Sequence, residues 1–128
     1  KILPNKRMLS SMTPTIVEKE GKLFMVVGTP GGTTIINSVF QTILNVIEHD
    51  MTMQDAVAAK RTHSQWLPDV IFNEVGALAE KDSVKLVKMG HTFKSRRSMG
   101  RVDAILVRAD GKLEGGADPR GDDAADGF

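Results

Sequence analysis

The stretch LFMVVGTPGGTTIINSVFQTILNVI, residues 23–47, decides the fold of this chain. It opens with a continuous apolar run at 23–27, which predicts a strand buried on both faces. The loop at 28–34 is dense in glycine and proline, which break regular structure. From 35 to 47, apolar residues recur at i, i+3, i+4 and i+7, so we expect an amphipathic helix with one face packed on the strand.

The sequence around this stretch predicts further strands and helices. The β-branched residues of 13–18 and a tight turn at 20–22 predict a hairpin with the strand 23–27. Downstream, the patterns predict a helix at 53–59 that is capped by Thr52, and a helix at 81–89 that ends at Gly90. They also predict strands at 70–75, 92–94, 102–108 and 113–117. Residues 118–128 are acidic and rich in glycine, which predicts a loosely held tail. Together these elements predict a single α+β domain over 1–128, with mostly antiparallel strands and packed helices.

Composition narrows the classes of partner and cofactor. Among 128 residues, 17 Lys and Arg stand against 16 Asp and Glu, and this net charge of +1 gives no general attraction to nucleic acid or anionic membranes. The absence of cysteine excludes disulfides, a thiolate nucleophile and cysteine-bound metal, and the three histidines lack metal-ligand spacing. No apolar run approaches the ~20 residues of a membrane helix. We therefore expect no metal, no cofactor, no nucleic acid and no membrane contact by this segment.

The glycine pair Gly31-Gly32 is a candidate anion site. It lies between the apolar strand and the start of the helix, where the first amides lack partners and meet the positive end of the helix dipole. Such amides suit a phosphate, a carboxylate or the oxyanion of an acyl-transfer intermediate. The alternative is a turn that needs glycine for its backbone angles alone. No Gly-Lys-Ser/Thr follows and no Gly-x-Gly-x-x-Gly is present, so neither nucleotide motif applies.

The serine pair Ser10-Ser11 is a second candidate. It stands between Pro4 and Pro14, where irregular backbone allows both hydroxyls to bind one carboxylate, although such a pair is also compatible with a solvated loop. No nucleophile with an adjacent general base is evident in the sequence. The residues by themselves therefore indicate a mixed α and β domain with a loop suited to anions.

Several motifs together resemble the γ-glutamyltransferase (γ-glutamyltranspeptidase) family. KRMLSSMTPT at 6–15 resembles the family's KRPLSSMTPT, VGTPGG at 27–32 resembles its GSPGG loop, and QWLPD at 65–69 matches its QWLPD. Further matches, in the same collinear order, are Met99-Gly100, Gly115, Asp118-Pro119-Arg120 and Gly127-Phe128. Thr29 stands where the family usually has serine. The resemblance covers nearly the whole chain.

The resemblance implies part of an N-terminal-nucleophile hydrolase, with an αββα sandwich of two stacked sheets between helix layers. A precursor of this family cleaves itself into a large and a small subunit, and the new N-terminal threonine of the small subunit is the nucleophile. It cleaves γ-glutamyl amides such as glutathione and transfers the glutamyl group to water, amino acids or peptides. Residues 1–128 resemble the C-terminal part of the small subunit. The implied partners are the rest of that subunit and the large subunit, in a periplasmic or extracellular protein.

The resemblance also assigns roles to matching residues. Ser10 and Ser11 would bind the α-carboxylate of the glutamyl group, and the amides of Gly31 and Gly32 would form the oxyanion hole. The family's nucleophilic threonine lies upstream of this segment, so we expect the isolated chain to be inert, and to self-associate through sheet surface left uncovered. Two alternatives remain open: an acylase of the same superfamily, acting for example on glutaryl side chains, and a non-enzymatic anion-binding or interaction domain. The serine pair favours a glutamyl substrate.

Overall fold

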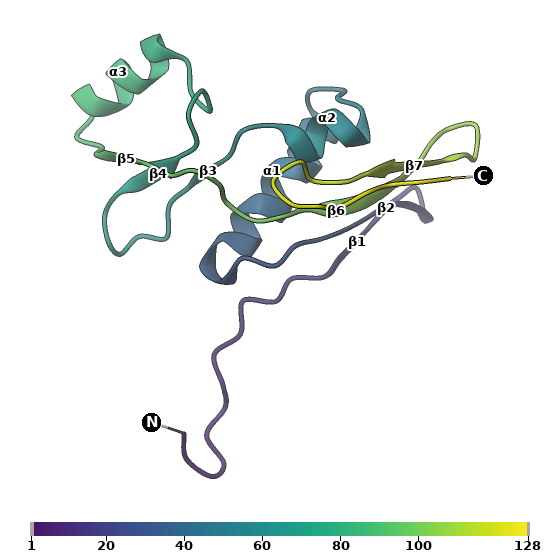
Figure 1. Cartoon of the computed structure of the whole chain (residues 1–128), viewed down its shortest axis with the longest axis horizontal. Helices are drawn as coiled ribbons and strands as arrows, with labels where there is room; N and C mark the ends of the chain where they lie inside the picture. Colours follow the sequence, from purple (N-terminus) through teal and green to yellow (C-terminus); the bar gives the residue numbers. More distant parts are fainter. Residues whose placement is uncertain (1, 128) are drawn as a thin grey trace.

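The larger of the two sheets is antiparallel, with strand order β1-β2-β6-β7 (Figure 1). The computed structural model describes residues 2–127. The strands of this sheet are β1 (Thr15–Lys19), β2 (Lys22–Gly28), β6 (Asp103–Val107) and β7 (Leu113–Gly116). β1 and β2 form the predicted hairpin, in which Thr15 pairs with Val27. β2 then pairs with β6 through Val26 and Ile105, so the hairpin joins the last third of the chain in one sheet.

Helices α1 (Ile35–Ile47) and α2 (Met53–Ala58) pack on one face of this sheet. α1 has the predicted bounds. Thr52 caps α2 as predicted, because its hydroxyl oxygen accepts a hydrogen bond from the Asp55 N–H at 3.1 Å. Buried apolar side chains fill the space between helices and sheet: Met25, Val27, Ile35, Val39, Val46, Met53, Ala56, Val57, Val102 and Ala104. The apolar face predicted for the helix 35–47 therefore packs into the core between helices and sheet.

The prediction that the strand 23–27 is buried on both faces is wrong. Met25 and Val27 face the helices and are 0% and 2% exposed, whereas Val26 between them is 41% exposed. Side chains alternate between the two faces of a strand, and α1 and α2 cover only one face of this sheet. The continuous apolar run therefore belongs to a strand whose second face stays open in this chain.

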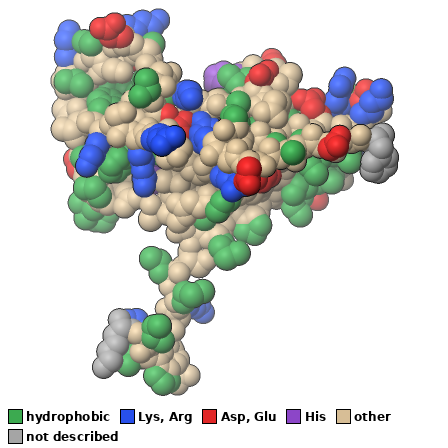
Figure 2. All heavy atoms as spheres, in the orientation of Figure 1, with side chains coloured by type: hydrophobic (Ala, Val, Ile, Leu, Met, Phe, Trp, Pro, Cys, Tyr) green, Lys and Arg blue, Asp and Glu red, His purple; other side chains and the backbone are tan. Residues whose placement is uncertain are grey.

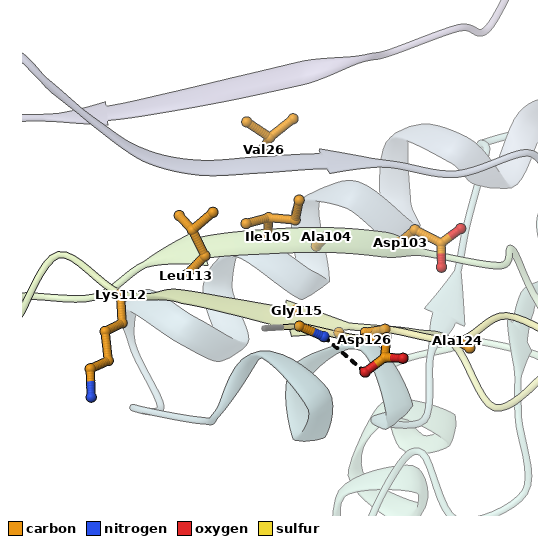
Figure 3. Close-up of a pocket in the computed structure, with 12 residues that line it drawn as sticks. Val26, Asp103, Ala104, Ile105, Lys112, Leu113, Gly115, Ala124 and Asp126 are labelled. Carbon is orange, nitrogen blue, oxygen red and sulfur yellow. Dashed lines mark hydrogen bonds between the residues drawn. The ribbon is translucent and has the colours of Figure 1, made fainter.

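The open face of the sheet is itself apolar. Ile16, Val26, Ile105 and Leu113 lie on it and are between 41% and 69% exposed. Val26, Ile105 and Leu113 stand on the same side of the sheet in Figure 3, where they line a groove of about 910 Å³ together with residues 124–127. Hydrophobic side chains are also exposed along the segment before β1 (Figure 2). Contiguous apolar surface of this kind commonly marks an interface.

A smaller sheet lies at the other end of the molecule, beside α3 (Figure 1). Its strands, in the order β3-β4-β5, are β3 (Thr62–His63), β4 (Ile71–Asn73) and β5 (Phe93–Ser95). β4 and β5 run parallel, because α3 (Glu80–Lys88) carries the chain back between them. The sequence patterns do not predict β3, since two residues have no measurable periodicity. α3 contains no buried side chain.

The predicted α+β class is confirmed. Every strand and helix expected from the sequence is present, with bounds that differ by a few residues. Residues 2–14 contain no helix or strand and project away from the sheet (Figure 1). Within residues 2–127, no helix is both long and apolar enough to cross a membrane.

Candidate functional site

The loop between β2 and α1 forms around the glycine pair singled out in the sequence. Gly31 has φ 147° and Gly32 has φ 59°, both in the left-handed region that favours glycine. A short 3-10 turn, Gly32–Thr34, then leads into α1. The Gly31 carbonyl accepts hydrogen bonds from the Thr34 N–H at 3.2 Å and the Thr34 hydroxyl at 2.9 Å. The loop is therefore a defined turn at the start of a helix.

The N–H groups of Gly31 and Gly32 are available to a ligand. Both residues are exposed, and within residues 2–127 neither amide donates to an acceptor. The first amides of a helix have no partner inside it and lie at the positive end of its dipole. Two adjacent exposed donors can hold a carboxylate, a phosphate or the oxyanion of an acyl-transfer step.

The serine pair lies on the segment that precedes β1. The Ser10 hydroxyl oxygen accepts the Met12 N–H at 3.3 Å, and Ser10 is exposed while Ser11 is half-buried. Because Thr15 pairs with Val27, the serine pair and the glycine loop leave the hairpin at the same end. The two motifs are therefore attached to the same end of the hairpin, but Ser10 and Ser11 lie on the segment that projects away from the sheet (Figure 1) and form no hydrogen bond with the glycine loop within the described residues.

The segment 99–102 lies directly against the glycine loop. The Arg101 N–H donates a hydrogen bond to the Thr29 Oγ1 at 2.7 Å. A Cβ on Gly31 would lie 3.3 Å from the Gly100 Cα, and a Cβ on Gly100 would lie 3.1 Å from the Thr29 Oγ1. Glycine at both positions therefore lets the two backbones approach closely.

A buried cluster of charged side chains stands behind this segment. It consists of Arg61, Glu74, Asp118 and Arg120, each no more than 9% exposed. Arg61 pairs with Asp118 at 2.8 Å, and Arg120 pairs with Asp118 at 2.9 Å. Arg120 also pairs with Glu74, so the four charges form one continuous network. Buried charges are tolerated in this way only when they are paired and hydrogen-bonded.

The charged cluster holds the backbone of the segment 99–102 at several points. Glu74 accepts the Met99 N–H at 2.8 Å, and the Met99 carbonyl accepts Arg61 at 2.8 Å. Asp118 accepts the Val102 N–H, also at 2.8 Å. Together with the bond from Arg101 to Thr29, these contacts fix the segment that supports the glycine loop.

The prediction of a loosely held tail is wrong for residues 118–123. Asp118 is fully buried in the charged cluster, and Asp122 and Asp123 both pair with the guanidinium of Arg101. Asp118, Asp122 and Asp123 are therefore partners of arginines, whereas Asp126 forms no ion pair within residues 2–127. Arg61 and Arg101 lie far from these carboxylates in the sequence, so local composition does not reveal their pairs.

Comparison with known proteins agrees with the motifs. The sequence profile described as Gamma-glutamyltranspeptidase matches residues 1–128, the whole chain. The chain belongs to the γ-glutamyltranspeptidase family.

Two relatives and one solved structure show the extent of the likeness. The chain is 43% identical over 127 residues to the glutathione hydrolase proenzyme of Escherichia coli strain K12, and 48% identical over 124 residues to that of Pseudomonas aeruginosa. These matches cover 98% and 94% of the chain, which spans 22% of the length of each relative. Its fold is similar to that of γ-glutamyltranspeptidase from Pseudomonas nitroreducens complexed with L-DON, with TM-score 0.87 and 42% identity over 99% of this chain and 67% of that one. The expected place within the N-terminal-nucleophile hydrolase fold is confirmed.

The pairing within the charged cluster is not evident from the sequence motifs, although Asp118 and Arg120 belong to one of them. Glu74 interrupts the apolar pattern of 70–75, and Arg61 follows the apolar end of α2. A charge inside an apolar pattern is a signal of a buried, paired residue. The partner, however, cannot be read from spacing, because Arg120 and Glu74 are 46 positions apart.

Other polar candidates have structural explanations. His63 is 2% exposed, and its two ring nitrogens lie 2.9 Å from the Asn37 Oδ1 and 2.9 Å from the Gln65 Oε1. His63 is therefore a packed, hydrogen-bonded histidine. Among residues 2–127, no group of three or more His, Asp or Glu is arranged to bind a metal ion.

The two carboxyl groups of the charged cluster are held ionised. Burial opposes their ionisation, but hydrogen bonds from Arg120 and from the Arg61 and Met99 amides outweigh it and keep the pKa of Glu74 below its ordinary value. Burial also opposes the ionisation of Asp118. Hydrogen bonds from the Val102 and Arg120 amides and from the Arg120 and Arg61 guanidinium groups outweigh it, so the pKa of Asp118 is lowered as well. Both carboxyls therefore bind protons more weakly in the folded protein than in the unfolded chain.

We expect this family member to lose stability in acid. The unfolded chain takes up protons first as the pH falls, so the free energy of unfolding should be level above about pH 5 and decrease below about pH 4. Urea unfolding at a series of pH values measures this, and Asp118→Asn should flatten the decrease. The control is Glu48→Gln, since Glu48 is exposed and forms no ion pair within residues 2–127. An unchanged acid dependence in Asp118→Asn would contradict the assignment.

Proposed function

We propose that this chain is the substrate-binding and oxyanion-hole portion of a γ-glutamyltranspeptidase that cleaves γ-glutamyl amides such as glutathione. The observation that carries the proposal is the pair of exposed amides on Gly31 and Gly32, which have no acceptor within residues 2–127. When a nucleophile attacks an amide carbonyl, negative charge develops on its oxygen. Two preorganised N–H donors stabilise that charge at the moment it forms. The named relatives are glutathione hydrolase proenzymes, which agrees with this chemistry.

Ser10 and Ser11 are proposed to bind the α-carboxylate of the glutamyl group. Two hydroxyl donors suit a carboxylate, and the pairing of Thr15 with Val27 supports a location at the same end of the sheet as the glycine loop. Neither residue acts in bond cleavage in this proposal. They orient the substrate so that its γ-carbonyl reaches the amides of Gly31 and Gly32.

The nucleophile is proposed to come from outside this chain, as the N-terminal threonine produced by self-cleavage of a precursor. In that case the chain is a fragment that is inert alone and that forms the C-terminal part of a small subunit. The chain's 22% share of its relatives' length agrees with it. The apolar open face around Val26, Ile105 and Leu113 then packs against the rest of the small subunit and the large subunit. We place the assembled enzyme in the periplasm or outside the cell, which fractionation of the source cells tests.

The test of the proposed function compares the isolated chain with the same chain expressed within its precursor. The precursor product should hydrolyse a γ-glutamyl anilide and transfer the glutamyl group to a dipeptide, while the isolated chain should do neither. Faster cleavage of a glutaryl anilide would favour the acylase alternative instead. Activity of the isolated 128-residue chain would refute the fragment proposal. Absence of all amidase activity from the precursor product would favour a binding domain.

We expect the isolated chain to self-associate through its open sheet face. Water-exposed Val26, Ile105 and Leu113 are stabilised when a second surface covers them. Analytical ultracentrifugation should therefore show dimers or larger species. Ile105→Lys should shift the distribution toward monomer, whereas Val84→Lys on α3, also exposed, should not. A wild-type chain that remains monomeric throughout would count against an uncovered interface.

The serine pair gives a separate prediction about binding. A hydrogen bond to a charged group contributes about 1.5–3 kcal/mol, so Ser10→Ala and Ser11→Ala should each raise KM for a γ-glutamyl anilide by roughly 10-fold or more. A 4-aminobutyryl anilide lacks the α-carboxylate, and its KM should stay unchanged in both variants. Ser64→Ala, at an exposed position outside the motif, is the matched control. Equal losses for both substrates would show that the serines do not bind the carboxylate.

A further inference from the structure

The two candidate oxyanion donors belong to peptide units whose opposite ends are held by threonines. The N–H of Gly31 shares a planar peptide unit with the carbonyl of Pro30, and the N–H of Gly32 shares one with the carbonyl of Gly31. Both units are trans. In a trans unit the C=O and N–H bonds point in opposite directions, so a contact that fixes the carbonyl also fixes the direction of the amide.

Thr29 holds the first of these peptide units. Its hydroxyl donates to the Pro30 carbonyl at 2.7 Å and accepts the Arg101 N–H at 2.7 Å. The hydroxyl is therefore used in both directions, and its rotation is constrained by the Arg101 backbone. Arg101 is itself held by the ion pairs of its side chain with Asp122 and Asp123.

Thr34 holds the second peptide unit. Its N–H and its hydroxyl both donate to the Gly31 carbonyl, at 3.2 Å and 2.9 Å. Thr34 is 4% exposed, so packing limits the rotamers of its side chain. Each of the two donor peptides thus has one threonine on its carbonyl side.

We propose that Thr29 and Thr34 are positioning residues that aim the amides of Gly31 and Gly32. This inference rests on the proposed function, since it assigns the origin of the oxyanion geometry. Neither threonine touches the substrate. Their effect is to reduce the reorientation that the two amides would otherwise undergo when charge develops on the substrate oxygen.

The test replaces the hydroxyl of Thr29 while preserving its shape. Thr29→Val should lower kcat of the precursor-derived enzyme by about 10- to 100-fold with KM changed less than about 3-fold, because misaligned donors act on the transition state. Thr29→Ser keeps the hydroxyl and should retain kcat within about 3-fold of the wild type. Thr34→Val and Thr34→Ser form a second pair with the same expectation. Rescue by serine separates hydrogen bonding from the packing of the methyl group.

A readout that does not depend on activity separates this inference from the proposed function. Backbone ¹⁵N relaxation should show faster motion of the Gly31 amide in Thr29→Val than in Thr29→Ser, at equal melting temperatures. If the wild type lacks γ-glutamyl activity but the amide still loosens, the proposed function fails and the positioning inference stands. If Thr29→Val is fully active and its Gly31 amide is unchanged, the positioning inference fails. If Thr29→Val does not fold, the Thr34 pair decides by the same two measurements.

Discussion

Replacing Asp118 by asparagine is expected to lower the free energy of unfolding by about 3–5 kcal/mol, because it leaves a buried guanidinium without its counter-charge. Asp118 is fully buried and pairs with both Arg61 and Arg120. Asparagine has nearly the same shape, so the loss reports on charge rather than on packing. Urea unfolding followed by circular dichroism measures the difference.

The matched control is Asp110→Asn. Asp110 pairs with Arg108 at 3.7 Å near the surface, and both side chains are about half exposed. An exposed pair of this kind contributes at most about 1 kcal/mol. A loss in Asp118→Asn no greater than the loss in Asp110→Asn would mean that the charged cluster does not stabilise the fold.

Replacing Gly31 by alanine is expected to reduce kcat/KM of the precursor-derived enzyme by at least about 100-fold, the usual effect of losing an oxyanion donor. The new Cβ would lie 2.6 Å from the Thr34 Oγ1 and 3.3 Å from the Gly100 Cα. It would therefore push the loop away from both the threonine that holds its carbonyl and the segment behind it. The φ of 147° adds backbone strain.

Gly111→Ala is the control for strain without close contact. Gly111 has φ 80°, and a Cβ there would meet nothing within 4 Å. We expect a modest loss of stability, roughly 1 kcal/mol, and unchanged kcat/KM. Full activity of Gly31→Ala, measured with a γ-glutamyl anilide, would contradict the assignment of this loop to the oxyanion hole.

The charged cluster and the glycine loop are connected through the segment 99–102. The cluster fixes Met99 and Val102, and Arg101 between them bonds to Thr29 on the loop. A change far from the loop, such as loss of Asp118, can therefore alter the geometry of the Gly31 amide. Residues far apart in the sequence therefore belong to one connected network of hydrogen bonds.

Local pattern was sufficient for the elements whose signal is local. The helix 35–47 has a full apolar stripe, and its observed bounds agree with the pattern because period and packing face coincide. The strand 23–27 was placed correctly but its burial was not, since its apolar run includes Val26, which faces away from the helices. An apolar residue indicates a surface that is stabilised by burial. It does not indicate whether the surface that buries it belongs to the same chain.

By itself the sequence determined the class of fold, the position of the glycine loop at a helix start, and the family through its collinear motifs. Only the tertiary structure decided which charges pair, that Asp118 is buried rather than part of a loose tail, and that the segment 99–102 supports the loop. The physical reason is the separation along the sequence between the residues that interact. Helical periodicity and turn conformations are set by near neighbours along the chain, whereas the partner of a buried charge is set by how distant segments come together.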